Sequence, residues 1–380
     1  MGAPLLEIHD LQKHFLVKKS FSAQNRVYLK AVDGVDLTME KGETIGLVGE
    51  SGCGKSTLGR TILKLHSVTG GQIVYEGKDI TKYTPDQMME YRRKMQLIFQ
   101  DPFASLNPRK TIMQSVEAPL DLSHDIPKAE RRERVIKMLD VVGLGEKYLN
   151  KYPHELSGGQ RQRIVIARAL INNPEMVVCD EPVSALDVSV RSQVLNLLKD
   201  LQEQMNLAYL FISHDLSVVQ YICDKVAVMY LGKIVEIANK EDLFTKPLHP
   251  YTKALLSAIP VPDIHHKKEE IILEGEVPSP LKPPKGCRFH PLPLCDRTLL
   301  AGDAAADRRG RQAQGCLPAL SGNQQLEKRG GEQRCFISTS ANIPICRIST
   351  TSNTAARRRI SPTSPRQAAA CAACAWWWRT

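Results

Sequence analysis

Residues 49–57, GESGCGKST, combine three glycines with a lysine and three hydroxyl side chains. Their spacing fits the phosphate-binding pattern G-x-x-x-x-G-K-[ST], in which glycines allow backbone N–H groups to turn towards phosphate oxygens. The lysine then reaches the β- and γ-phosphates, and the hydroxyl that follows it binds Mg²⁺. We therefore predict a nucleoside triphosphate site. Its phosphate-binding residues would be Gly49, Ser51, Gly52, Cys53, Gly54, Lys55, Ser56 and Thr57, with Ser56 also a metal ligand and Cys53 a small filler.

A second set of candidate residues follows the apolar stretch 176–179. A buried strand there would end in Asp180 and Glu181, just as residues 44–48 form an apolar strand before the glycine loop. An aspartate at a strand end can hold Mg²⁺, and a neighbouring glutamate can polarise an attacking water. Together with the glycine loop, this pair predicts ATP hydrolysis in addition to ATP binding.

The stretch HELSGGQRQRIVIARAL, residues 154–170, contains a possible second anion site. Ser157, Gly158 and Gly159 would open a helix, leaving a hydroxyl and unpaired N–H groups at its N-terminus. One glycine loop has no obvious use for a second phosphate site about a hundred residues away. Two chains arranged head-to-tail do, because each can complete the nucleotide pocket of the other.

The sequence LSGGQ, which includes Gln160, resembles the signature of the ABC ATPases, and the resemblance extends over residues 5–290. It implies ATP and Mg²⁺ as ligands. By this resemblance Gln100 is the Q-loop glutamine at the metal or the water, Asp187 belongs to the D-loop, and His214 is the switch histidine at the γ-phosphate. Phe15 resembles the aromatic residue that stacks on adenine, with Tyr28 as the competing candidate.

The fold implied by this resemblance is a RecA-like α/β core with an antiparallel β edge near the N-terminus. A helical subdomain is expected at about 101–160, where Val135, Met138, Leu139 and Val142 have helical spacing. We assign 1–245 to the nucleotide-binding domain and 246–291 to a C-terminal segment. Residues 292–380 form a further extension.

Three other classes of ABC ATPase fit less well. Lys55 and Leu156 are 101 positions apart, which leaves no room for the long coiled coil of DNA-repair and chromosome ATPases. Translation-factor ATPases carry two cassettes, and exporters usually contain membrane helices, whereas no apolar run of membrane-spanning length occurs in this chain. A separate importer subunit remains, with a separate-subunit exporter as the less favoured alternative.

Two stretches favour a peptide importer. QDPFASLNPRKTI and KPLHPYTKALLSAIP resemble segments of oligopeptide, dipeptide and nickel importer ATPases. The resemblance implies a heterodimer with a second related ATPase, two transmembrane permease subunits and a periplasmic or extracellular substrate-binding protein. The chain would act peripherally at the cytoplasmic face of the bacterial cell membrane. Short peptides are the favoured cargo, and nickel or glutathione is the alternative.

The charge distribution gives no reason to expect a nucleic-acid partner. The net charge is +10, but residues 298–380 hold 12 Arg and Lys against 4 Asp and Glu, or +8. The rest of the chain is therefore close to neutral, at +2. Seven of the ten cysteines lie from Cys287 onward, and all three tryptophans lie at 376–378. The sequence thus changes character near residue 290.

The family pattern stops abruptly after Pro291. Members that bind an iron–sulfur cluster have a cysteine six positions after the one at Cys287, but this chain has Pro293. A permitted coding of residues 291–304, read one base later, gives RCPYAIERCWRETP, with the expected cysteine spacing. We therefore predict that residues 292–380 are out-of-frame translation and that any cluster is lost. The alternative is a basic disordered tail that binds RNA or anionic lipid.

Overall fold

The computed structural model describes residues 3–18, 26–122, 126–259, 271, 278–284 and 287–289, with the backbone of 305–306 and 312–313. All of these belong to one compact unit, Met1–Pro318. The predicted out-of-frame segment 292–380 lies outside the described residues except at those two dipeptides, and so does Pro293.

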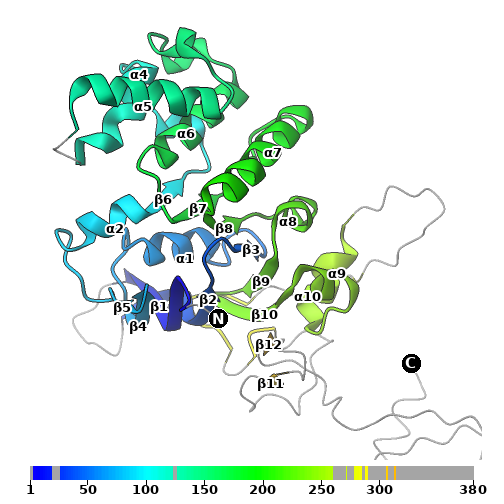
Figure 1. Ribbon diagram of the computed structural model, residues 1–380. Helices are drawn as coiled ribbons and strands as arrows, with labels where there is room; N and C mark the ends of the chain where they lie inside the picture. Colours follow the sequence, from blue (N-terminus) through cyan, green and yellow to red (C-terminus); the bar gives the residue numbers. More distant parts are fainter. Residues whose placement is uncertain are drawn as a thin grey trace, which may run out of the picture. The chain divides into compact units, whose positions relative to one another are not determined.

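A mainly parallel sheet forms the centre of this unit (Figure 1). Its five parallel strands are rich in Val, Ile and Leu, as expected where both faces of a sheet are covered. In spatial order they are β6 (Met95–Ile98), β7 (Met176–Asp180), β8 (Ala208–Ile212), β3 (Thr44–Val48) and β9 (Lys225–Tyr230). The antiparallel strands β10 (Lys233–Asn239), β12 (Gln312–Ala313) and β11 (Ala305–Ala306) extend the sheet beyond β9.

The N-terminal part of the chain contributes two strands to a separate antiparallel sheet, as the sequence predicts. Its order is β2 (Val27–Met39), β1 (Leu6–Lys18), β4 (Gly70–Tyr75) and β5 (Lys78–Asp79). Helix α1 (Lys55–Ile62) packs between the two sheets: Leu58 and Ile62 share one apolar cluster with residues of β1 and β3. This packing fixes the start of α1 between the sheets.

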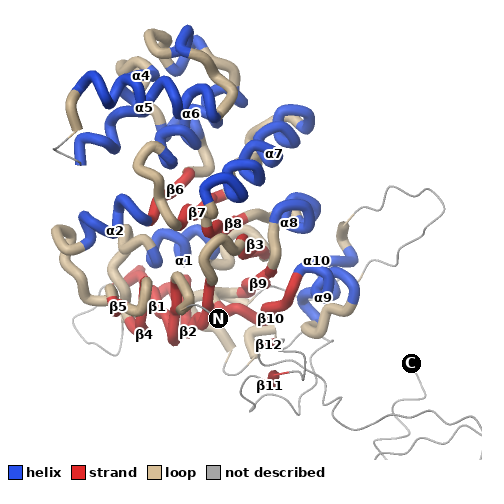
Figure 2. The backbone as a smooth tube through the Cα atoms, viewed as in Figure 1, coloured by secondary structure: helices blue, strands red, loops and turns tan. Residues whose placement is uncertain are grey.

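Most of the remaining helices cover the other face of the parallel sheet or form a subdomain beyond it (Figure 2), whereas α2 packs in the same apolar cluster as α1. Between β6 and β7 lie α3 (Pro102–Ser105), α4 (Ile112–Glu117), α5 (Lys128–Val141) and α6 (Gly158–Leu170), with 3₁₀ turns at Ala118–Leu122, Glu146–Tyr148 and Pro153–Glu155. The apolar positions of α5 predicted from the sequence are buried. The other helices are α2 (Met88–Lys94), α7 (Val188–Met205), α8 (Leu216–Ile222), α9 (Lys240–Thr245) and α10 (Pro250–Ser257).

Candidate functional site

The glycine loop connects β3 to α1, at the carboxyl end of a central parallel strand. Gly52 and Gly54 have φ of 81° and 112°, in the left-handed region that favours glycine. A Cβ at Gly54 would lie 2.1 Å from the carbonyl oxygen of Ala31, so a side chain there would collide with backbone. A Cβ at Gly52 would meet nothing within 4 Å. The loop is therefore held tightly at one glycine and open at the other.

Lys55 is the first residue of α1, and its side chain folds back over the loop. Its Nζ donates to the carbonyl oxygens of Gly49 and Glu50, each at 2.8 Å, and the residue is 5% exposed. Cys53 Sγ lies 3.8 Å from the same Nζ. Burial raises the pKa of the Cys53 thiol, so this side chain is neutral at physiological pH, consistent with a filler.

Ser56 and Asp180 provide oxygen atoms of the kind that Mg²⁺ prefers. Asp180 ends β7 and is 1% exposed; its Oδ1 accepts a hydrogen bond from the Ser56 hydroxyl at 2.6 Å. No group of three or more His, Cys, Asp or Glu among the described residues could hold a metal. A hydroxyl and a carboxylate fit Mg²⁺, which usually takes one or two protein carboxylates and completes its shell with phosphates and water.

Arg60, which the sequence analysis did not single out, also contacts Asp180. Its Nη2 lies 3.3 Å from Asp180 Oδ2. The buried carboxylate is therefore bound on one side by a hydroxyl and on the other by a guanidinium.

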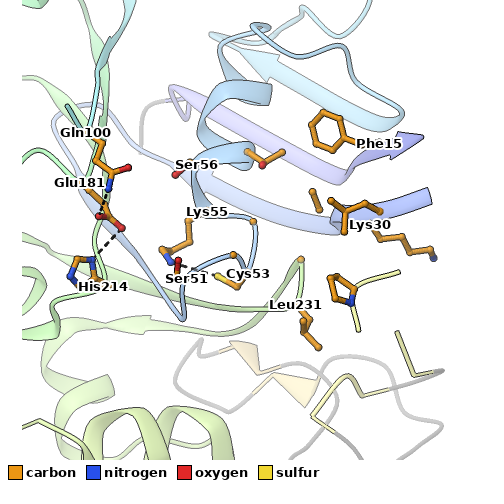
Figure 3. Close-up of a pocket in the computed structure, with 17 residues that line it drawn as sticks. Phe15, Lys30, Ser51, Cys53, Lys55, Ser56, Gln100, Glu181, His214 and Leu231 are labelled. Carbon is orange, nitrogen blue, oxygen red and sulfur yellow. Dashed lines mark hydrogen bonds and ion pairs between the residues drawn. The ribbon is translucent and has the colours of Figure 1, made fainter. Parts of the chain in front are cut away.

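Glu181 lies between Gln100, predicted at the metal or the water, and His214, predicted at the γ-phosphate. Gln100 Nε2 donates to Glu181 Oε2 at 3.0 Å, and His214 Nδ1 lies 3.2 Å from Glu181 Oε1 (Figure 3). Glu181 has a φ of 49°, a conformation that non-glycine residues rarely adopt and that is often found at functional sites. Its N–H donates to Ile212 O at 3.0 Å, which ties this strained residue to the end of β8.

A cavity of about 470 Å³ collects most of the predicted residues. Phe15 lines it and is half-buried, whereas Tyr28 is 41% exposed and is not among its lining residues. The predicted lining residues are Phe15, Ser51, Gly52, Cys53, Gly54, Lys55, Ser56, Thr57, Gln100, Glu181 and His214. The sequence analysis missed six further lining residues, which are Leu29, Lys30, Ala31, Leu231, Gly232 and Pro280. Of these residues, only Leu231 and Gly232 have a local sequence signal, because they form the two-residue turn between β9 and β10.

The predicted second anion site lies apart from this cavity. Ser157 caps α6: its hydroxyl accepts from Gln160 N–H at 3.4 Å, and Gln160 Oε1 accepts from Ser157 N–H at 3.0 Å. Gly159 faces Val190 at the start of α7, where a Cβ would lie 2.3 Å from Val190 Cγ1. Asp187 is exposed at the N-terminus of α7. None of Ser157, Gly158, Gly159, Gln160 and Asp187 is among the described residues that line the cavity.

Comparison with known families and structures agrees with this arrangement. Residues 32–184 match the ABC transporter family, and residues 235–296 match the oligopeptide/dipeptide transporter C-terminal region. The oligopeptide transport ATP-binding protein AppF of Bacillus subtilis (strain 168) is 52% identical over 289 residues, which are 75% of this chain and 88% of that protein. The dipeptide transport ATP-binding protein DppF of Escherichia coli (strain K12) is 52% identical over 287 residues, 76% of this chain and 86% of that protein.

A solved structure shows the same fold. The ATP-binding cassette MJ0796, in a dimeric post-hydrolysis state bound to ADP and Pi, superposes with a TM-score of 0.55 and 29% identity over 62% of this chain and 98% of that chain. The fold and the site define an ABC ATPase cassette, and the chain belongs to the family of oligopeptide and dipeptide transport ATP-binding proteins. The predicted fold class, family and ATPase activity coupled to transport are confirmed.

Within the part of the chain that the structure describes, no helix combines the length and apolar character needed to cross a membrane.

Proposed function

We propose that this chain binds Mg·ATP in the cavity and that its hydrolysis powers uptake of di- and oligopeptides through a membrane permease. The observation that carries the proposal is the convergence of three side chains from three elements on one cavity. Lys55 comes from α1, Glu181 follows β7 and His214 follows β8. The cargo is inferred from relatives whose names state oligopeptide and dipeptide transport.

Each side chain has a role that follows from its position. Lys55 leaves its two carbonyl partners to neutralise the β- and γ-phosphates. Glu181 takes a proton from the attacking water. The water oxygen forms a bond to the γ-phosphorus while the bond from that phosphorus to the ADP oxygen breaks. Gln100 and His214 hold the Glu181 carboxylate in place. Mg²⁺ held by Ser56 and Asp180 would neutralise charge on the phosphate oxygens.

A second, related ATPase subunit would complete the site. The signature residues and Asp187 do not line this chain's own cavity, and the solved cassette structure of MJ0796 is a dimer. In a head-to-tail pair, Ser157 of this chain would face the nucleotide of its partner. Ser157→Arg should therefore leave ATP binding by the isolated chain unchanged but lower ATP hydrolysis by the assembled transporter. A matched Lys55→Met variant should lose ATP binding in the isolated chain. Equal ATP-binding defects in both variants would contradict the arrangement.

The permease would dock beside Gln100. A groove of about 830 Å³ lies between the core and the helical subdomain, lined by Phe99, Gln100, Asp101 and Ala104 among others. Phe99 is 38% exposed and the nearby Phe103 is 63% exposed, so apolar surface is available to a partner. Docking there would place the chain peripherally at the cytoplasmic face of the cell membrane. A substrate-binding protein would deliver cargo on the other side.

Uptake of labelled dipeptide and labelled nickel, in cells whose only copy is wild type or Glu181→Gln, tests the cargo. Loss of dipeptide uptake with nickel uptake intact is the expected result. Loss of nickel uptake alone would instead identify a nickel importer, and retention of both would contradict a role for this chain in either pathway.

Residues 292–380 are proposed to be the product of a one-base deletion near codon 291. The match to the peptide-transporter C-terminal region ends at residue 296, which supports this origin. Resequencing the locus from independent isolates tests it. A continuous reading frame that encodes the same residues 292–380 in related isolates would overturn the proposal.

A further inference from the structure

The C-terminal segment, defined as the described part of residues 246–289, contacts the nucleotide cavity directly. We propose that it positions the phosphate-binding loop, and that Tyr251 is the positioning residue. Glu50 N–H, in the loop, donates to the Tyr251 hydroxyl at 3.1 Å across 201 positions of sequence. This inference rests on the proposed role of the loop in ATP binding, and it gives the C-terminal segment a part in that binding.

The residues around Tyr251 hold it in one orientation. His249 is the N-cap of α10: its Nδ1 accepts from Tyr251 N–H at 3.1 Å, and Pro250 follows at the first helical position. The Glu236 carboxylate of β10 accepts the N–H groups of Leu248 and His249, each at 2.9 Å. Glu236 and His249 are both 0% exposed. A buried network therefore connects the start of α10 to the central sheet.

Aromatic packing fixes the Tyr251 ring as well as its backbone. The ring centroid lies 4.6 Å from that of Tyr230 and 5.8 Å from that of Phe289, and Tyr251 is 0% exposed. Leaving a buried polar group unpaired costs about 1–3 kcal/mol. In this contact the Tyr251 hydroxyl and the Glu50 N–H satisfy each other. The hydroxyl is thus aimed at the loop by a ring that has little freedom to turn.

The peptide unit between Gly49 and Glu50 transmits this contact to Lys55. Its N–H, from Glu50, donates to Tyr251, and its carbonyl oxygen, from Gly49, accepts from Lys55 Nζ at 2.8 Å. Because a peptide unit is planar, fixing the N–H restricts the direction of the carbonyl in the same unit. Tyr251 therefore stabilises the loop conformation from which Lys55 reaches the phosphates. Tyr251 is not among the described residues that line the cavity, so its effect is one of positioning.

The same segment also reaches the end of the cavity near Phe15. Pro280 lines the cavity, and its carbonyl oxygen accepts from Lys30 N–H at 3.4 Å. The Arg288 guanidinium, 4% exposed, donates to Leu231 O and to the Asp33 carboxylate. Two of these contacts reach residues that line the cavity, Lys30 and Leu231, and the Tyr251 contact reaches the phosphate-binding loop, which a mere covering of the sheet edge would not require.

Tyr251→Phe and Tyr230→Phe form a matched pair for the test. Both keep a buried aromatic ring, but the Tyr230 hydroxyl has no hydrogen-bond partner among the described residues. Loss of one net hydrogen bond of about 0.5–1.5 kcal/mol corresponds to a change in affinity of about two- to twelvefold. We expect Tyr251→Phe to raise the Kd and KM for ATP by such a factor, with kcat at saturating ATP changed less than about twofold. Tyr230→Phe should leave all three within about twofold.

Amide hydrogen exchange reports on the phosphate-binding loop itself, separately from the stability of the whole protein. Faster exchange of the amides of 49–57 in Tyr251→Phe, with unchanged exchange in Tyr230→Phe, is the expected result, and ATP should suppress the difference. Equal KM and equal loop exchange in the two variants would overturn the inference, as would a lowered melting temperature with KM unchanged. Lys55→Met distinguishes a failure of the proposed ATP site from a failure of the proposed role of Tyr251. If wild-type protein binds ATP no better than this variant, it is the ATP site that is wrong.

Discussion

The Glu181 carboxylate and the His214 imidazole lie 3.2 Å apart, Oε1 to Nδ1, at the ends of two adjacent parallel strands. The second carboxylate oxygen accepts from Gln100, which follows the edge strand β6. Because the carboxyl ends of parallel strands meet along one edge of a sheet, three distant stretches of sequence converge on one carboxylate. Glu181 also has a strained backbone conformation, which its neighbours must stabilise.

Glu181→Gln is expected to remove hydrolysis and to leave ATP binding intact. The amide keeps the shape of the side chain but cannot accept the proton of water, so kcat should fall by about 10²- to 10⁴-fold. Single-turnover hydrolysis and equilibrium ATP binding measure the two effects separately. Glu203→Gln, at an exposed position of α7, is the control and should behave as wild type. A Glu181→Gln protein that hydrolyses ATP at more than a tenth of the wild-type rate would remove Glu181 from the chemistry.

Arg60→Met is expected to destabilise the nucleotide-free protein more than the Mg·ATP-bound protein. Arg60 donates to the buried Asp180 carboxylate, and a hydrogen bond to a charged group contributes about 1.5–3 kcal/mol. The melting temperature should therefore fall by several degrees without nucleotide. With Mg·ATP, the difference in melting temperature between Arg60→Met and wild type should become smaller, because a divalent cation beside Asp180 then replaces the missing guanidinium charge.

Thermal unfolding with and without Mg·ATP measures this difference. Arg92→Met is the matched control, since Arg92 lines the same groove as Arg60 but has no ion pair to Asp180. The assignment of Asp180 as a metal ligand would be contradicted if Mg·ATP left the gap between Arg60→Met and wild type unchanged.

Phe15→Ala is expected to weaken ATP binding, and Tyr28→Ala is not. Phe15 lines the cavity, whereas Tyr28 is 41% exposed and lies outside its lining. Stacking of a base on an aromatic ring contributes about 1–3 kcal/mol, or about five- to 150-fold in Kd. Titration with ATP and with inorganic triphosphate separates the two ends of the site, because only ATP carries the base. Equal losses for both ligands would show that Phe15 supports the loop and does not contact adenine.

The elements around the phosphates could be predicted because their signals are local. Strands β3 and β7 are continuous apolar runs, and both are fully buried as such runs predict. Helix α6 begins at Gly158 because Ser157 and Gln160 form a capping box that is visible in the sequence. In each case the residues that determine the structure lie within a few positions of one another.

The remaining lining residues of the cavity and the contact to Tyr251 could not be predicted in this way. Leu231 and Pro280 reach the cavity through a hairpin and a C-terminal segment whose paths depend on tertiary packing. The left-handed backbone of Glu181 also has no local signature, and the hydrogen bond that accompanies it goes to Ile212 on the neighbouring strand. The contacts that complete the site are long-range, so no periodicity or spacing encodes them.

Acid is expected to destabilise the C-terminal segment through His249. Burial, followed by the nearby Lys253 charge, lowers the pKa of His249 to about 3, against 6.5 in its ordinary state. Between these values the unfolded chain binds a proton that the folded chain does not, so stability rises with pH across this window and is lost as pH falls through it. From pH 7.5 to 5 the loss should be about 2 kcal/mol.

Comparison of His249→Asn with wild type between pH 7.5 and 5 measures this contribution by denaturant unfolding. Asparagine is a good N-cap, so it can still accept a hydrogen bond at the start of α10, but it does not titrate in this range. The Glu236 carboxylate beside the backbone of His249 is present in both proteins, so the comparison isolates the side chain at position 249. We expect the variant to be less stable than wild type at pH 7.5 and to lose less stability on acidification. Parallel stability curves for the two proteins would mean that His249 is not the group that titrates.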